Sequence, residues 1–154
     1  MKHLKAFIRA AAASAVLVCG ALFSACAQDT SIGAAKAEVL ASDTGHVVIE
    51  VTEGDTSKSL YDALTVFQEE EKLTFSGSES EYGYYITSVN GVEAAGDSYW
   101  AVYTTLGTLD GTSYSDAQWG TFEYEGKTLA SASYGVSGLP LVAGEYYALV
   151  WTAM

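Results

Sequence analysis

The sequence is poor in the residues that most often carry chemistry. Its 154 residues include two cysteines, two histidines and one proline. Cys19 lies in an apolar N-terminal stretch that we expect to be removed, which leaves Cys26 as the only thiol. A single thiol excludes a disulfide framework and a thiolate zinc site. His46 is the only histidine beyond residue 3, and its polar neighbours predict a solvated imidazole rather than a base or metal ligand.

Positive charge is scarce as well. Three of the seven basic residues precede residue 10, so a chain that begins at residue 26 has no arginine and a formal charge of 4 − 19 = −15. Such a charge disfavours nucleic acid, phosphate-rich ligands and anionic lipid surfaces as partners. An acidic surface that keeps an exported domain soluble is the simpler interpretation, ahead of a surface built for a cationic partner. The remaining lysines are Lys36, Lys58, Lys72 and Lys127.

Catalytic motifs are missing. The sequence has no G-x-S-x-G elbow, no glycine-rich phosphate loop, and no second histidine or well-placed lysine to activate a serine. Its acidic residues fall in runs typical of a surface, so we predict a protein that is not an enzyme and has no cofactor. Asp110, Ser113 and Asp116 offer oxygen donors for calcium, but without EF-hand spacing, and a plain Asp-Gly turn is the favoured interpretation. No metal site is predicted.

The N-terminus predicts export and a lipid anchor. A basic start, MKHLKAFIR, precedes an apolar stretch over residues 10–23 and the sequence LFSAC. These are the parts of a secretory signal peptide, here residues 1–25. The small residues before Cys26 resemble the bacterial lipobox, which implies acylation of Cys26, although Phe23 departs from the usual aliphatic residue. We therefore expect an extracytoplasmic, membrane-anchored lipoprotein at the cell surface, with simple secretion or a retained signal anchor as alternatives.

The rest of the chain predicts one α+β domain. Residues 26–36 are small and polar and read as a tether, so the domain is expected over residues 37–154. The segments AEVLAS and HVVIEVTE predict two strands joined by a turn, with Val47, Ile49 and Val51 on the core face. Helical spacing follows over residues 58–70, with Thr56, Ser57 or Ser59 as the cap. Short strands then continue to the C-terminus, which favours a mainly antiparallel sheet with one amphipathic helix.

Two details of the strands can be predicted. Asn90-Gly91 is typical of a tight hairpin turn. Ile86 and Val89 differ by an odd number and cannot share one face of a regular strand, so we expect a bulge near Thr87-Ser88. The closing strand, residues 146–151, alternates apolar residues on both faces and is expected to be central in the sheet.

Aromatic residues, in contrast, are abundant: the sequence contains eleven tyrosines and three tryptophans. Three motifs, GYYITSVNGV (residues 83–92), SYWAVY (98–103) and LVAGEYYALVW (141–151), resemble the C-terminal β-domain of the transcobalamin and intrinsic factor family. They are still more similar to the transcobalamin-C-terminal-like domains of exported bacterial proteins. The likeness covers about residues 47–151. It implies a β-grasp fold of the soluble-ligand-binding group and, as ligand, a corrinoid such as cobalamin.

The resemblance also implies which residues face a ligand. The matching positions are Tyr85, Asn90, Tyr99 and Trp100, and Trp119 is added from an insertion over residues 106–132 that departs from the family pattern. In the vertebrate carriers a helical barrel closes the site, so here a partner chain would supply the other wall. The alternative is a module that contacts a protein or glycan through a flat aromatic patch. A concave site would favour a ligand pocket instead.

Overall fold

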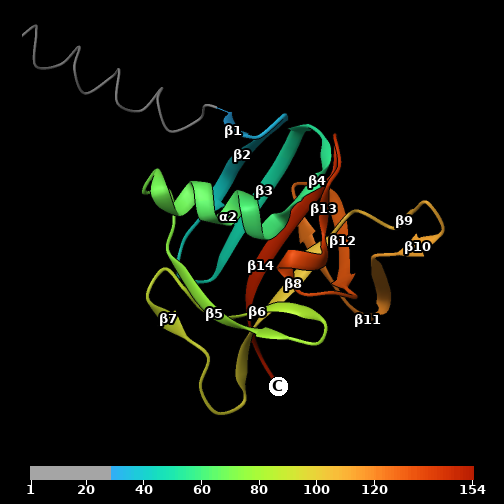
Figure 1. The fold of residues 1–154 in the computed structure, drawn as a ribbon. Coiled ribbons are helices and arrows are strands. Elements are labelled where there is room, and N and C mark those ends of the chain that lie inside the picture. The colour runs from blue at the N-terminus through green and yellow to red at the C-terminus, as the bar shows by residue number, and fades with distance from the viewer. Residues whose placement is uncertain (1–28) are drawn as a thin grey trace, which may run out of the picture.

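A computed structural model describes residues 29–154, so the expected signal peptide (residues 1–25) and the expected lipid-anchor residue, Cys26, lie outside the described residues. Its centre is a seven-stranded sheet in which all neighbours are antiparallel, covered on one side by one α-helix (Figure 1). The predicted α+β architecture is confirmed. In sheet order the strands are β1 (Thr30–Ile32), β2 (Ala35–Ser42), β3 (His46–Glu53), β14 (Tyr146–Ala153), β8 (Ser98–Thr104), β12 (Lys127–Ala132) and β11 (Ser115–Tyr124).

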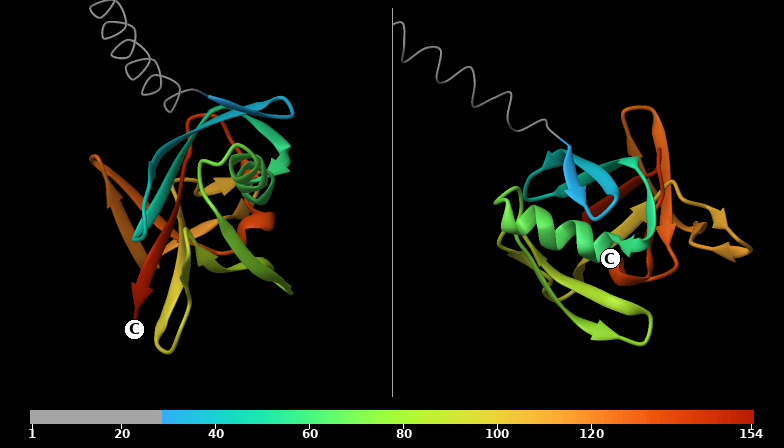
Figure 2. Two further views of the ribbon diagram at one scale, coloured as in Figure 1. Left: turned by 90° about the vertical axis from the view of Figure 1, so that its left-hand side faces the viewer. Right: turned by 45° about the horizontal axis from the view of Figure 1, so that its top comes forward.

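Three small sheets complete the fold. They are β4 (Asp55–Ser59) with β13 (Pro140–Leu141), β5 (Phe75–Ser80) with β6 (Gly83–Val89) and β7 (Val92–Glu93), and β9 (Thr108–Leu109) with β10 (Thr112–Ser113). A 3-10 turn, η1 (Val136–Gly138), precedes β13. In Figure 2 the helix is seen end-on in the left view, on one side of the main sheet. None of the helices in residues 29–154 is long and apolar enough to cross a membrane.

The helix α2 (Leu60–Glu69) begins at a complete capping box. Ser59 Oγ accepts a hydrogen bond from the Asp62 N–H (3.3 Å), and Asp62 Oδ2 accepts one from the Ser59 N–H (2.8 Å). These bonds satisfy two amides that have no partner within the helix. Leu60, Ala63, Leu64 and Phe67 are buried, as their spacing predicted.

Replacing Ser59 with alanine is expected to lower the free energy of unfolding by about 1 kcal/mol, because the Asp62 amide loses its acceptor. Chemical denaturation followed by circular dichroism measures the change. Thr56→Ala is the matched control, since Thr56 was an alternative cap candidate and is exposed in β4. We expect that control to stay within about 0.5 kcal/mol of the wild type. Equal losses in the two variants would contradict the assignment of Ser59 as the cap.

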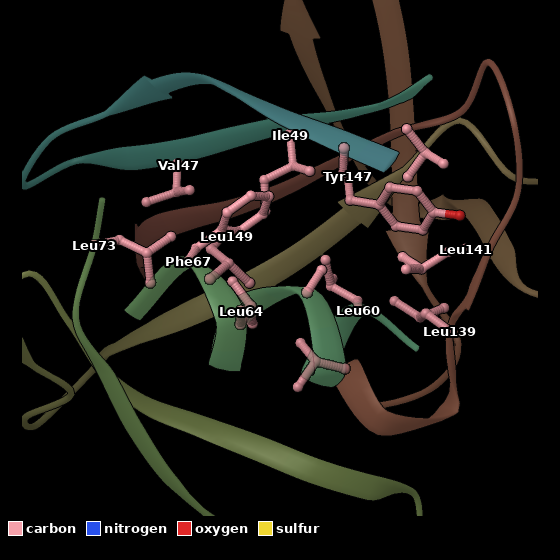
Figure 3. Close-up of a cluster of buried hydrophobic side chains, with 14 of the residues drawn as sticks. Val47, Ile49, Leu60, Leu64, Phe67, Leu73, Leu139, Leu141, Tyr147 and Leu149 are labelled. Carbon is pink, nitrogen blue, oxygen red and sulfur yellow. The ribbon is translucent and has the colours of Figure 1, made fainter. Parts of the chain in front are cut away.

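The core lies between α2 and the central strands (Figure 3). Val47, Ile49 and Val51 of β3 are fully buried on the face toward the helix, as predicted. β14 pairs with β3 on one side and with β8 on the other. It is apolar on both faces, because Tyr147 joins the main core while Ala148 belongs to a second cluster behind the sheet. The predicted central position of the closing strand is therefore confirmed.

The expected tether is wrong over residues 30–36. β1 pairs with β2, and Thr30 and Ile32 are buried. The helix end holds this strand: Thr30 Oγ1 donates to Glu70 Oε2 (2.7 Å), and Lys72 Nζ lies 2.5 Å from Thr30 Oγ1 and 3.2 Å from Glu70 Oε2. The bond from Thr30 is the main reason that the pKa of Glu70 is lowered. The acidic end of the helix is thus tied to the sheet.

The predicted hairpin and bulge are both present. Asn90 and Gly91 have φ angles of 49° and 81°, and β7 turns back on β6. Ser76 pairs with Ser88 but Gly77 pairs with Ile86, so Thr87 is the extra residue of β6. This bulge lets both Ile86 and Val89 reach the core.

Candidate functional site

The main sheet opens between β8 and β12. β14 pairs with β8 along its whole length, whereas β12 pairs with it only at Thr104 and Tyr103. Beyond Ser131, β12 continues its pairing with β11, at Ala132 and Ser115. Among the described strands none pairs with residues 99–102 on this edge. A depression of about 310 Å³ lies there, bordered by β6, β8, β11 and the segment after β12.

The lining of this depression, which we call the aromatic depression, has an unusual composition for this chain. It contains no Asp, Glu, Lys, Arg, His or Cys. These are the side chains that usually act as acids, bases, nucleophiles or charged ligands of a metal. Small and aliphatic residues and two serines, Ser131 and Ser133, fill the space between aromatic rings. The aromatic members are Tyr82, Tyr84, Tyr85, Tyr99, Trp100, Tyr103, Trp119 and Tyr134.

Four of the five residues expected at a ligand site meet here: Tyr85, Tyr99, Trp100 and Trp119 all line the aromatic depression. Their exposure differs widely. Tyr85 is 46% exposed and Trp119 75%, whereas Trp100 is 1% exposed. The Trp100 indole donates from Nε1 to the Val92 carbonyl (2.8 Å), and its ring centroid lies 5.4 Å from that of Trp151. Trp100 therefore belongs to the core and forms part of the floor.

The structure places the fifth residue, Asn90, elsewhere. Its Oδ1 accepts a hydrogen bond from the Thr74 N–H (3.1 Å), and its Nδ2 donates to Ser42 Oγ (3.0 Å) and to the Asp43 carbonyl (2.8 Å). Asn90 borders a different depression of about 480 Å³ beside the C-terminal end of α2. Its amide links the β6–β7 hairpin to the β2–β3 turn, so it does not join the other four residues.

Trp119 owes its position to an irregularity in β11. Asp116 pairs with Ser131 and Thr121 with Ala130, so residues 117–120 protrude from the ladder. The Asp116 carboxylate accepts a hydrogen bond from the Gln118 N–H (2.8 Å), which holds the start of this bulge. Gly120 ends it with φ 132°, which a side chain would make strained. We call residues 117–120 the Trp119 bulge.

Sequence reasoning missed two exposed rings of the site. Tyr82, in the β5–β6 turn, is 65% exposed, and Tyr134, after β12, is 38% exposed. Together with Tyr85 and Trp119 they account for four of the five large hydrophobic residues that are exposed in the described part of the chain. Each of the two rings precedes a glycine in a turn sequence, EYG or SYG. An aromatic residue in a turn is not needed to fill a core, and this is the signal that could have indicated both residues.

The remaining polar candidates have local structural roles. Asp110 and Gly111, with φ angles of 50° and 82°, form the tight turn between β9 and β10, so the favoured interpretation as an Asp-Gly turn is confirmed. Within residues 29–154, no group of three or more His, Cys, Asp or Glu side chains is placed to hold a metal ion. His46 is half-buried rather than solvated: its Nδ1 lies 3.5 Å from Asp43 Oδ1, and its ring packs beside Phe122.

Comparison with protein-family models gives no match for this chain, and neither does comparison with curated proteins. Interpretation of the site therefore depends on its geometry and on the three sequence motifs.

Proposed function

We propose that this protein is a non-enzymatic, lipid-anchored extracytoplasmic domain of β-grasp type that binds a small uncharged molecule in the aromatic depression. One observation carries the proposal: Tyr85, Tyr99, Trp100 and Trp119 line a single concave site without a charged side chain. The order of strand, helix and strand supports the β-grasp assignment.

Charge supports an uncharged ligand. The chain from residue 26 carries 19 acidic residues against four lysines, yet none of them lines the depression. An anion would approach against the field of the whole domain. A cation would find no carboxylate to pair with inside the site. Aromatic faces and phenolic hydroxyl groups suit a ligand with flat apolar surfaces and hydrogen-bonding edges.

The concave shape of the depression favours binding of a small molecule rather than contact with a partner through a flat patch. A volume of about 310 Å³ is at the lower end of the range for small-molecule pockets. A corrinoid, the ligand that the family resemblance implies, is larger than this space. It would rest one face on the exposed rings, and a partner chain would cover the other face.

Titration of the purified protein with cobalamin and related corrinoids tests this function. We expect saturable heat in calorimetry and quenching of tryptophan fluorescence, with Trp119 as the main reporter because it is the most exposed tryptophan of the depression. The Trp119→Phe variant should retain binding and lose much of the signal. Absence of heat and of specific quenching up to about millimolar corrinoid would contradict stand-alone corrinoid binding.

The lipid anchor has a separate test. Mass spectrometry of the mature N-terminus is expected to show a diacylated Cys26 as the first residue. An unmodified terminus at another position would contradict the anchor and leave the ligand site unaffected.

A further inference from the structure

We infer that the uncharged ligands of the aromatic depression include neutral oligosaccharides, which stack one sugar ring on Trp119. This inference rests on the proposed function, namely that the depression binds an uncharged ligand, and it names a class of ligand besides the corrinoids. Three features of the site support it: the exposed indole, the hydroxyl groups around it and the absence of charge.

The first feature is the Trp119 bulge. The Trp119 indole is 75% exposed and keeps a large apolar surface in water. Trp119 has no partner in the pairing of β11 with β12, which resumes at Thr121, so the sheet does not explain this exposed ring. Bulges in sheets commonly re-aim a side chain, and this one places the indole at an open site. One face of a pyranose ring presents mainly C–H groups. Such a face packs well on an open aromatic ring, whereas a compact apolar ligand requires an enclosed pocket.

The second feature is the set of hydroxyl groups in the lining. Tyr82, Tyr85 and Tyr134 are exposed, and Ser131 and Ser133 lie in the same depression. A hydroxyl group both donates and accepts hydrogen bonds, which matches the hydroxyl groups of a sugar in either direction. A purely apolar ligand would leave these groups unpaired on binding, at a cost in free energy for each group that it buries.

The third feature is charge. With no charged residue in the lining and a formal charge of −15 on the chain from residue 26, the site disfavours sialylated or sulfated sugars. Quaternary ammonium compounds can also bind aromatic rings. The lining offers them no carboxylate, so a neutral ligand fits the site better.

A glycan array with the purified protein, followed by calorimetry with cellotriose, maltotriose and triacetylchitotriose, tests the inference. We expect saturable binding of at least one neutral glycan and a change in tryptophan fluorescence. Because an aromatic contact contributes about 1 kcal/mol, Trp119→Ala should weaken binding by about fivefold. Trp119→Phe should retain part of the affinity. Gln118→Ala is the matched control, since Gln118 is exposed on the same bulge and does not line the depression.

The outcomes are distinguishable. Binding of a corrinoid with no binding of any neutral glycan would overturn the inference and leave the proposed function standing. Glycan binding that is equal in the wild type, Trp119→Ala and Tyr85→Ala would place the sugar elsewhere and overturn it too. Preference for choline or for sialylated glycans would overturn the assigned ligand class. No binding of glycans or corrinoids, in a protein whose circular dichroism shows it to be folded, would overturn the inference and contradict stand-alone corrinoid binding.

Discussion

Replacing Trp100 with alanine is expected to lower the free energy of unfolding by about 3–5 kcal/mol. The indole is 1% exposed and packs in the core that joins α2 to the sheet, beside Trp151. Its removal creates a cavity and also leaves the Val92 carbonyl without the Nε1–H donor. Both changes act on the folded state alone, and together they place this substitution among the most destabilising single changes in the chain.

Trp119→Ala is the matched comparison, because both tryptophans line the aromatic depression. Trp119 is 75% exposed, so we expect its removal to change stability by less than about 0.5 kcal/mol. Urea denaturation of both variants, followed by circular dichroism, measures the difference. A Trp100→Ala protein within about 1 kcal/mol of the wild type would show that the indole is not a core residue. Trp100→Phe separates the two contributions, since it keeps most of the ring volume and loses the hydrogen bond.

The elements that could be predicted from sequence are those whose signals are local. The helix shows its apolar spacing and its cap within a dozen residues. The structure begins it at Leu60, two residues later than predicted, and selects Ser59 from the three candidate caps. The Asn90-Gly91 turn requires only the positive φ angles that these two residues readily adopt. The bulge at Thr87 follows from the odd separation of Ile86 and Val89, because both must reach one core.

The start of the domain could not be predicted, because its signal is not local. The residues around Thr30 are small and polar and carry no strand pattern. Thr30 becomes buried through contacts with Glu70 and Lys72, which lie 40 and 42 positions further along the chain. Sequence periodicity contains no information about such partners.

The site could be predicted only in part, because some of its contacts also join residues that are far apart in the sequence. Family resemblance selected Tyr85, Tyr99 and Trp100, and the structure brings them together with Trp119. The resemblance also selected Asn90, which the structure places outside the site, because its amide donates to Ser42 and Asp43, more than 45 positions earlier. Nor does sequence alone separate the buried indole of Trp100 from the exposed one of Trp119, since this difference depends on which strands pair around each ring.

Tyr147 is expected to make the stability of the fold sensitive to alkaline pH. Its ring is fully buried, its hydroxyl donates to the Pro140 carbonyl (2.5 Å), and the same oxygen accepts a hydrogen bond from the Val142 N–H (3.2 Å). Burial raises the pKa of Tyr147, an effect that the bond from Val142 opposes only in part. The folded protein therefore keeps this proton to higher pH than the unfolded chain does.

The sign of the effect follows from that difference. The contribution of Tyr147 is complete below the ordinary tyrosine pKa of about 10 and is lost as the pH rises from there toward the raised pKa of the folded state. Each pH unit in that range lowers the free energy of unfolding by about 1.4 kcal/mol. Between pH 10 and pH 12 the loss reaches about 2–3 kcal/mol for this one group.

Tyr147→Phe isolates the contribution. At neutral pH the variant should be less stable by about 1–3 kcal/mol, because the partly buried Val142 amide loses its acceptor and the Pro140 carbonyl loses its donor. Above about pH 10 the variant lacks the titration of residue 147 and its contribution to the loss of stability, so the two stability curves should converge. Denaturant unfolding at intervals from pH 7 to pH 12 measures both curves. Curves that stay parallel across this range would show that the buried phenol does not hold its proton more tightly in the folded state.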